Sequence, residues 1–130
     1  MTTKYGFGKA VDYSHAQALT RVTQALQQEG FGILTEIDVA ATMKKKLDLD
    51  MPPYRILGAC NPQLAHQAIQ AEASIGLLLP CNVLVREDDF GKVYVEFMDP
   101  DAVLQLVGKP EIQQLAQQVR ERLDRVMASL

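Results

Sequence analysis

The two cysteines of the chain are the residues whose type and position best suit chemistry. Each is followed by asparagine, in the segments Gly58–Pro62 and Leu79–Val83. Cys60 stands where a predicted strand ends and a predicted helix begins at Asn61. The unpaired backbone N–H groups and the positive dipole end of a helix lower the pKa of a nearby thiol. This position predicts a nucleophilic thiolate at Cys60, with Cys81 as a resolving partner or a second metal ligand.

Core packing is the competing interpretation of both cysteines, because a free cysteine behaves as a small apolar residue and is often buried. His66 follows in the helix after Cys60, so Cys60, His66 and Cys81 form a candidate set for zinc binding or proton transfer. The spacing of this set matches no compact zinc signature, and a fourth ligand is missing. We therefore expect no resident metal and no cofactor, with His66 on a helix surface.

Three acidic residues suggest a catalytic carboxylate pair, since such pairs perform general acid and base catalysis. Glu36 falls in a predicted strand, Asp38 is explained as a helix cap, and Glu72 ends another helix. Their separation in space does not follow from the sequence. The basic run of residues 44–46 could bind an anion together with Arg55, although such a run is usually a solvated helix end.

Length and composition restrict the class of protein. The 130 residues predict one domain, residues 1–130, that is large enough to fold without disulfides or metals. A net charge of −3 argues against a nucleic-acid partner. The longest apolar run, residues 75–81, is far shorter than the ~20 residues that cross a bilayer, and the N-terminus lacks the apolar core of a signal peptide. We therefore expect a cytoplasmic protein with free thiols and no membrane partner.

Hydrophobic periodicity predicts the elements that position these residues. Ser14 with Gln17 forms a capping box, Asp38 and Asn61 are further helix caps, and segment 75–80 is either a buried strand or an apolar connection. Strands alternate with helices at first, and a hairpin follows. The order predicts an α+β two-layer domain with helices on one face of a mixed or mostly antiparallel sheet. The other face needs a cover, so we expect a homodimer. Strands are predicted at 5–13, 31–37, 54–60, 82–87 and 92–98, and helices at about 15–29, 39–47, 62–72, 100–107 and 110–130.

Three segments in this order resemble one known family. They are residues 31–38 followed by a Lys-rich helix, residues 54–62, and residues 72–87 with the run 75–83. Together they are similar to the prokaryotic family catalogued as domain of unknown function 302, from about residue 5 to residue 130. The resemblance implies a small α+β protein that forms dimers, without an established activity. The family pattern includes the positions here of Glu36, Cys60, Glu72, Pro80, Cys81, Asn82 and Arg86.

Two functional hypotheses remain at this point. The chain has no Gly-rich phosphate loop, no GxSxG and no CxxC motif, which favours a binding or assembly module for a small molecule or a protein. The candidate ligand-binding residues are then Glu36, Glu72, Asn82 and Arg86. The alternative is a thiol-dependent protein with a redox, nucleophilic or metal-ligand role, in which Cys60, Cys81 and His66 are the candidate catalytic residues.

Overall fold

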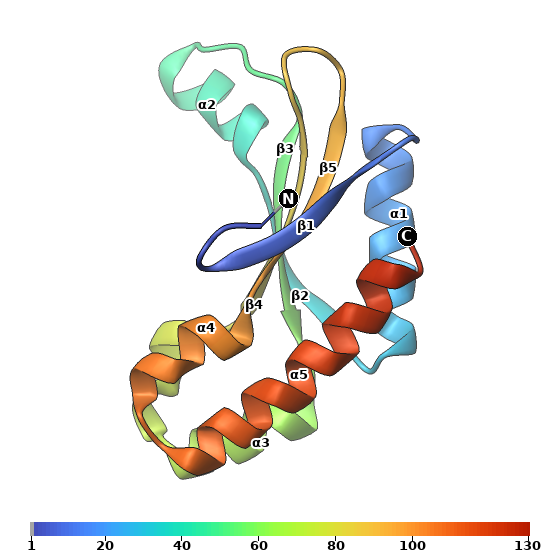
Figure 1. Ribbon diagram of the computed structural model, residues 1–130. Helices are drawn as coiled ribbons and strands as arrows, with labels where there is room; N and C mark the ends of the chain where they lie inside the picture. Colours follow the sequence, from blue (N-terminus) through green and yellow to red (C-terminus); the bar gives the residue numbers. More distant parts are fainter. Residues whose placement is uncertain (1) are drawn as a thin grey trace.

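Five antiparallel strands form one sheet in the computed structural model, which describes residues 2–130 (Figure 1). The strand order is β1-β5-β4-β3-β2, and every neighbouring pair is antiparallel. This arrangement confirms the expected α+β two-layer fold. A mixed or mostly antiparallel sheet was expected, and the sheet is antiparallel. The strands are β1 (Gly6–Val11), β2 (Gly32–Asp38), β3 (Tyr54–Cys60), β4 (Cys81–Glu87) and β5 (Val93–Met98).

The helices begin where capping side chains satisfy free backbone N–H groups. Ser14 accepts from the Gln17 backbone in a complete capping box, and Asn61 accepts from the Leu64 backbone. Asp38 caps the helix that follows β2, as expected. The segment predicted as a strand or connection at 75–80 instead contains the end of a 3₁₀ helix. The helices are α1 (His15–Gln28), α2 (Val39–Leu47), α3 (Pro62–Ala71), η1 (Ala73–Leu78), α4 (Pro100–Leu104), η2 (Gln105–Val107) and α5 (Pro110–Ala128).

Helices cover one face of the sheet. Val83, Val85 and Phe97 alternate with partly exposed residues along β4 and β5, so one face of these strands lies in the core. The opposite face, called the open face below, carries the other residues of each strand. Helix α2 buries no side chain and projects from the end of the sheet (Figure 1). Helix α5 contributes the buried side chains Ile112, Leu115, Ala116, Val119, Leu123 and Val126.

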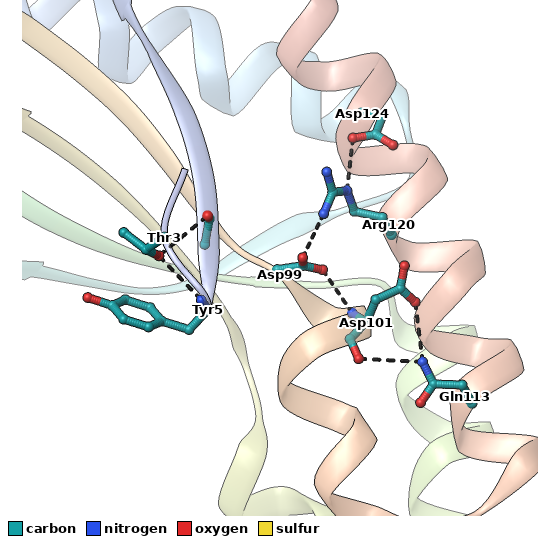
Figure 2. A network of polar contacts seen from close by, with 8 residues as sticks. Thr3, Tyr5, Asp99, Asp101, Gln113, Arg120 and Asp124 are labelled. Atoms are coloured by element: carbon teal, nitrogen blue, oxygen red, sulfur yellow. Dashed lines mark hydrogen bonds and ion pairs between the residues drawn. The ribbon is translucent and has the colours of Figure 1, made fainter. Parts of the chain in front are cut away.

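A polar network fixes α5 against the end of β5 (Figure 2). Asp99 caps α4 by accepting from the Asp101 backbone at 3.0 Å, and its other carboxylate oxygen contacts Arg120 at 2.8 Å. Arg120 also donates to Asp124 at 2.9 Å and lies 3.7 Å from the ring centroid of Phe7. Because the Arg120 guanidinium joins α5 to Phe7 of β1 and to Asp99 between β5 and α4, the network holds α5 against this end of the sheet.

The fold generates a prediction at Gly8, where β1 approaches β5 closely. A Cβ atom at Gly8 would lie 2.3 Å from the Val95 carbonyl oxygen and 2.8 Å from the Glu96 Cα, whereas one at Gly32 would meet no atom within 4 Å. We expect Gly8→Ala to lower the free energy of unfolding by about 1–3 kcal/mol, as overpacking does. Gly32→Ala, the matched control, should be neutral or slightly stabilising. Urea denaturation measures both, and equal stabilities would contradict the close approach.

Candidate functional site

The two cysteines lie beside each other at the junction of β3 and β4. Cys60 is the last residue of β3 and Cys81 the first of β4, and the register pairs Cys81 with Ala59. Both are free thiols that line the same pocket. Cys81 is only 8% exposed, and Cys60 is half-buried. The structure therefore brings together two residues that stand far apart in the sequence.

The pocket around the thiols has apolar walls and a volume of about 320 Å³. Apart from the thiols, Asn61 is the one polar side chain among its lining residues in the described chain. Two wall residues, Leu34 and Ile69, are 65% and 46% exposed, so apolar surface faces solvent here. The site is an apolar hollow that opens to solvent. Its walls also include Leu64, Ala65, Ala68, Leu79, Leu104 and Leu115.

Each wall is held by an element that the rest of the fold positions. Helix α3 starts at Pro62, two residues after Cys60, because the side chain of the intervening Asn61 caps it. Helices α4 and α5, fixed by the Asp99–Arg120 pair, supply the far wall. Pro80 packs against the sheet at Gly58, where a Cβ atom would lie 2.8 Å from the Pro80 Cγ. The pocket is thus formed by the fold itself.

Burial shifts the pKa of both thiols in the direction opposite to the one expected from the helix start at Cys60. Burial raises the pKa of Cys60 above its ordinary value. Burial first, and the neighbouring Cys60 second, raise the pKa of Cys81 to about 11. The prediction that Cys60 stands at a helix start is correct, and burial is the cause that shifts its pKa there. These shifts favour the neutral thiol over the thiolate at both positions.

Asn82 and Arg86 belong to a separate cleft on the open face. The register places them across from Gly58 and Tyr54 of β3, and both line a cleft of about 570 Å³. Arg86 donates to Glu96 from Nη2 at 2.8 Å and from Nε at 3.2 Å. The hydrogen bond to Glu96 is the main cause that raises the pKa of Arg86, so the guanidinium stays charged. Asn82 and Arg86 were candidate ligand-binding residues from the sequence, whereas Glu96 was not among the candidates.

Glu36 and Glu72 belong to ion pairs in different parts of the molecule. Arg55 contacts both Glu36 and Asp38, whereas Glu72 contacts Lys109 at 3.2 Å. Asp38 acts as the expected helix cap. Glu72 therefore has a different basic partner from Glu36 and Asp38, which share Arg55.

The basic run at the end of α2 does not join Arg55 in an anion site. Lys44 pairs with Asp48 at 3.0 Å and with Asp50 at 3.3 Å, and Arg55 is neutralised by its own acidic partners. All three lysines of the run, residues 44–46, are exposed. The solvated-helix-end interpretation is the one that fits this geometry.

His66 lies on the exposed surface of α3 and does not line the thiol pocket. Within residues 2–130, no group of three or more His, Cys, Asp and Glu side chains is arranged to hold a metal ion. The Cys60, His66 and Cys81 set is therefore not assembled. What the structure assembles instead is the cysteine pair with its apolar walls.

Fold and site define a small α+β domain with an apolar, thiol-lined pocket on one side of its sheet and a polar cleft on the other. The chain belongs to the family described as Domain of unknown function DUF302, whose model matches residues 7–130. A solved relative is the uncharacterized conserved protein DUF302 from Bacillus stearothermophilus. It is 25% identical, with a TM-score of 0.89 and 98% of each chain covered.

Curated relatives match part of the chain. The proteins named fluoride-specific ion channel FluC 1 of Brucella suis biovar 1 and Brucella abortus biovar 1 are each 33% identical over 88 residues. The match covers 68% of this chain and 34% and 32% of those proteins. The chain thus spans about a third of the length of the curated relatives it matches. Among residues 2–130, none of the helices is both long and apolar enough to span a bilayer.

The raised pKa values predict slow alkylation of both cysteines in native protein. A thiol with a pKa of about 11 carries about 100-fold less thiolate at pH 8 than one with the ordinary value of 9.0. We expect iodoacetamide to label Cys60 before Cys81, and both rates to rise as the pH increases. Mass spectrometry of native and urea-unfolded protein measures this. An alkylation midpoint below pH 8 for Cys60 would contradict the buried, neutral thiol.

Proposed function

We propose that this protein is a small-molecule-binding domain whose ligand occupies the thiol-lined pocket. The observation that carries the proposal is the pocket itself, an apolar hollow of about 320 Å³ formed between elements that the core holds in place. Ligand pockets in proteins usually have volumes of about 300–1,000 Å³ and mostly apolar walls. Exposed apolar residues at the pocket, Leu34 and Ile69, would also gain from being covered by a ligand.

The lining residues indicate an uncharged, apolar or aromatic ligand. No Lys, Arg, His, Asp or Glu lines the pocket in the described chain, so a buried charge on the ligand would find no partner. The thiol sulfurs of Cys60 and Cys81 are polarizable and pack well against aromatic rings. A ligand with one polar group could place that group near Asn61 or solvent while its apolar part fills the pocket.

A thiol-dependent function is the second candidate, and the shared pocket of Cys60 and Cys81 favours it. The raised pKa values disfavour a resting nucleophile. A role in which both sulfurs act together fits the arrangement better. Two free thiols also suit a reducing compartment, so we propose the cytoplasm as the location.

We also propose that a second copy of the chain covers the open face. Tyr54, Tyr94, Met98 and Arg86 lie there, and these residue types are enriched at protein interfaces. The Arg86–Glu96 pair provides both signs of charge on one surface, which can complement itself across a twofold axis. The thiol pocket lies on the opposite side of the sheet, so the dimer would leave it accessible.

Filling the pocket tests the ligand proposal. Ala65 lines the pocket from α3, and Ala65→Leu would occupy space that the ligand needs. With the uncharged fluorophore N-phenyl-1-naphthylamine as the probe, we expect the dissociation constant to rise at least tenfold. Ala128→Leu, on the exposed end of α5, is the matched control and should change binding less than twofold. Equal affinity in both variants, or no binding by the unmodified protein, would refute the proposal.

A charge on the open face tests the dimer. We expect light scattering to give twice the 14.4 kDa chain mass, and Leu84→Glu to give the mass of one chain, because it buries a carboxylate at the interface. Leu77→Glu on η1, where the leucine is 89% exposed, should leave the dimer intact. A single-chain mass for the unmodified protein would disprove the expected homodimer.

A further inference from the structure

The two thiols are arranged as a pair of ligands. In the antiparallel register Cys81 is opposite Ala59, so Cys60 is one residue beyond the position facing it. Ala59 and Cys60 are neighbours on β3, and neighbouring strand residues normally face opposite sides of a sheet. Because β3 ends at Cys60, Cys60 nevertheless lines the same pocket as Cys81. Their proximity is also evident because Cys60 contributes to the raised pKa of Cys81. No side-chain hydrogen bond engages either sulfur among the interactions described for residues 2–130.

The pocket provides no charge partner for two thiolates. Its walls are apolar, and none of its lining residues is basic. Deprotonated sulfurs would therefore require a cation that enters with them, and soft thiolate ligands select soft ions such as Cu(I). We propose that Cys60 and Cys81 together bind one Cu(I) ion as a two-coordinate bis-thiolate.

The reaction balances without an oxidant or reductant. One Cu⁺ ion and two thiols give a complex of one copper and two thiolates with a net charge of −1, and two protons go to the solvent. Copper stays in the +1 state and sulfur is not oxidised. Helix α3, ten residues long, begins at Pro62 beside Cys60, so its positive end can stabilise the negative complex.

Coordination number separates Cu(I) from zinc at this position. Zinc in proteins takes four ligands, or three with an open position, from Cys, His, Asp and Glu. The described residues hold no group of three such side chains, and His66 lies outside the pocket. A two-coordinate ion needs only the cysteine pair. The apolar walls of Leu64, Ala68 and Leu115 would shield the complex from water and competing ligands.

The experiment is an anaerobic titration of the full chain with Cu(I) in competition with bicinchoninate, whose copper complex is coloured. We expect one copper per chain and two sulfur ligands by X-ray absorption spectroscopy. Cys60→Ala and Cys81→Ala should each weaken binding at least 100-fold. Cys60 is half-buried at a strand end, so Cys60→Ala provides the decisive comparison even if Cys81→Ala impairs folding. Circular dichroism and thermal unfolding establish that each variant is folded.

Three results would overturn the proposal: copper affinity within threefold of the unmodified protein in the folded Cys60→Ala variant, one copper shared by two chains, or zinc binding as tight as copper binding. This inference does not depend on the apolar-ligand proposal. Copper binding without binding of N-phenyl-1-naphthylamine would support the metal site and refute the ligand function. Binding of N-phenyl-1-naphthylamine without copper binding would support the ligand function and refute the metal site.

Discussion

The candidate sites depend on one constraint: helices cover one face of the sheet and leave the other face open. Side chains alternate across a strand, so consecutive residues of β4 serve different sides of the molecule. Cys81 faces the helices and joins Cys60 in an apolar pocket, whereas Asn82 faces the open side with Arg86. A single step along β4 therefore separates two chemical environments. The helix layer removes water from the thiols, and the open face keeps the Arg86–Glu96 pair partly solvated.

Local signals predicted most of the fold. Caps at Ser14, Asp38 and Asn61 bond to their own helices, so their evidence lies within a few residues of sequence. Burial alternates with a period of two along β4 and β5, whereas β1, β2 and β3 show no such alternation. The apolar run at 75–80 failed as a signal since its hydrophobicity does not reflect burial: Ile75 is buried, but Leu77 is 89% exposed. Such a run is equally compatible with a strand and with a 3₁₀ helix.

The candidate sites needed information that the sequence carries only indirectly. Nothing in the linear separation of Cys60 and Cys81 reveals that β3 and β4 are neighbours. The sequence predicted strands at 82–87 and 92–98, but β5 begins at Val93, one residue later, and Arg86 pairs with Tyr94. That single residue decides which side chains surround the guanidinium. The direction of the thiol pKa shift depends on burial, a tertiary property that the local position of Cys60 before a helix does not reveal.

The proposed function places an apolar ligand in the pocket on the helix side of the sheet. Intermolecular nuclear Overhauser effects between N-phenyl-1-naphthylamine and methyl-labelled protein would locate the ligand. We expect contacts from the ligand ring to the methyl groups of Ala65, Ala68 and Leu115, which line the pocket. Contacts to Leu84 and Met98 instead would place the ligand in the cleft on the open face and would refute binding in the thiol-lined pocket.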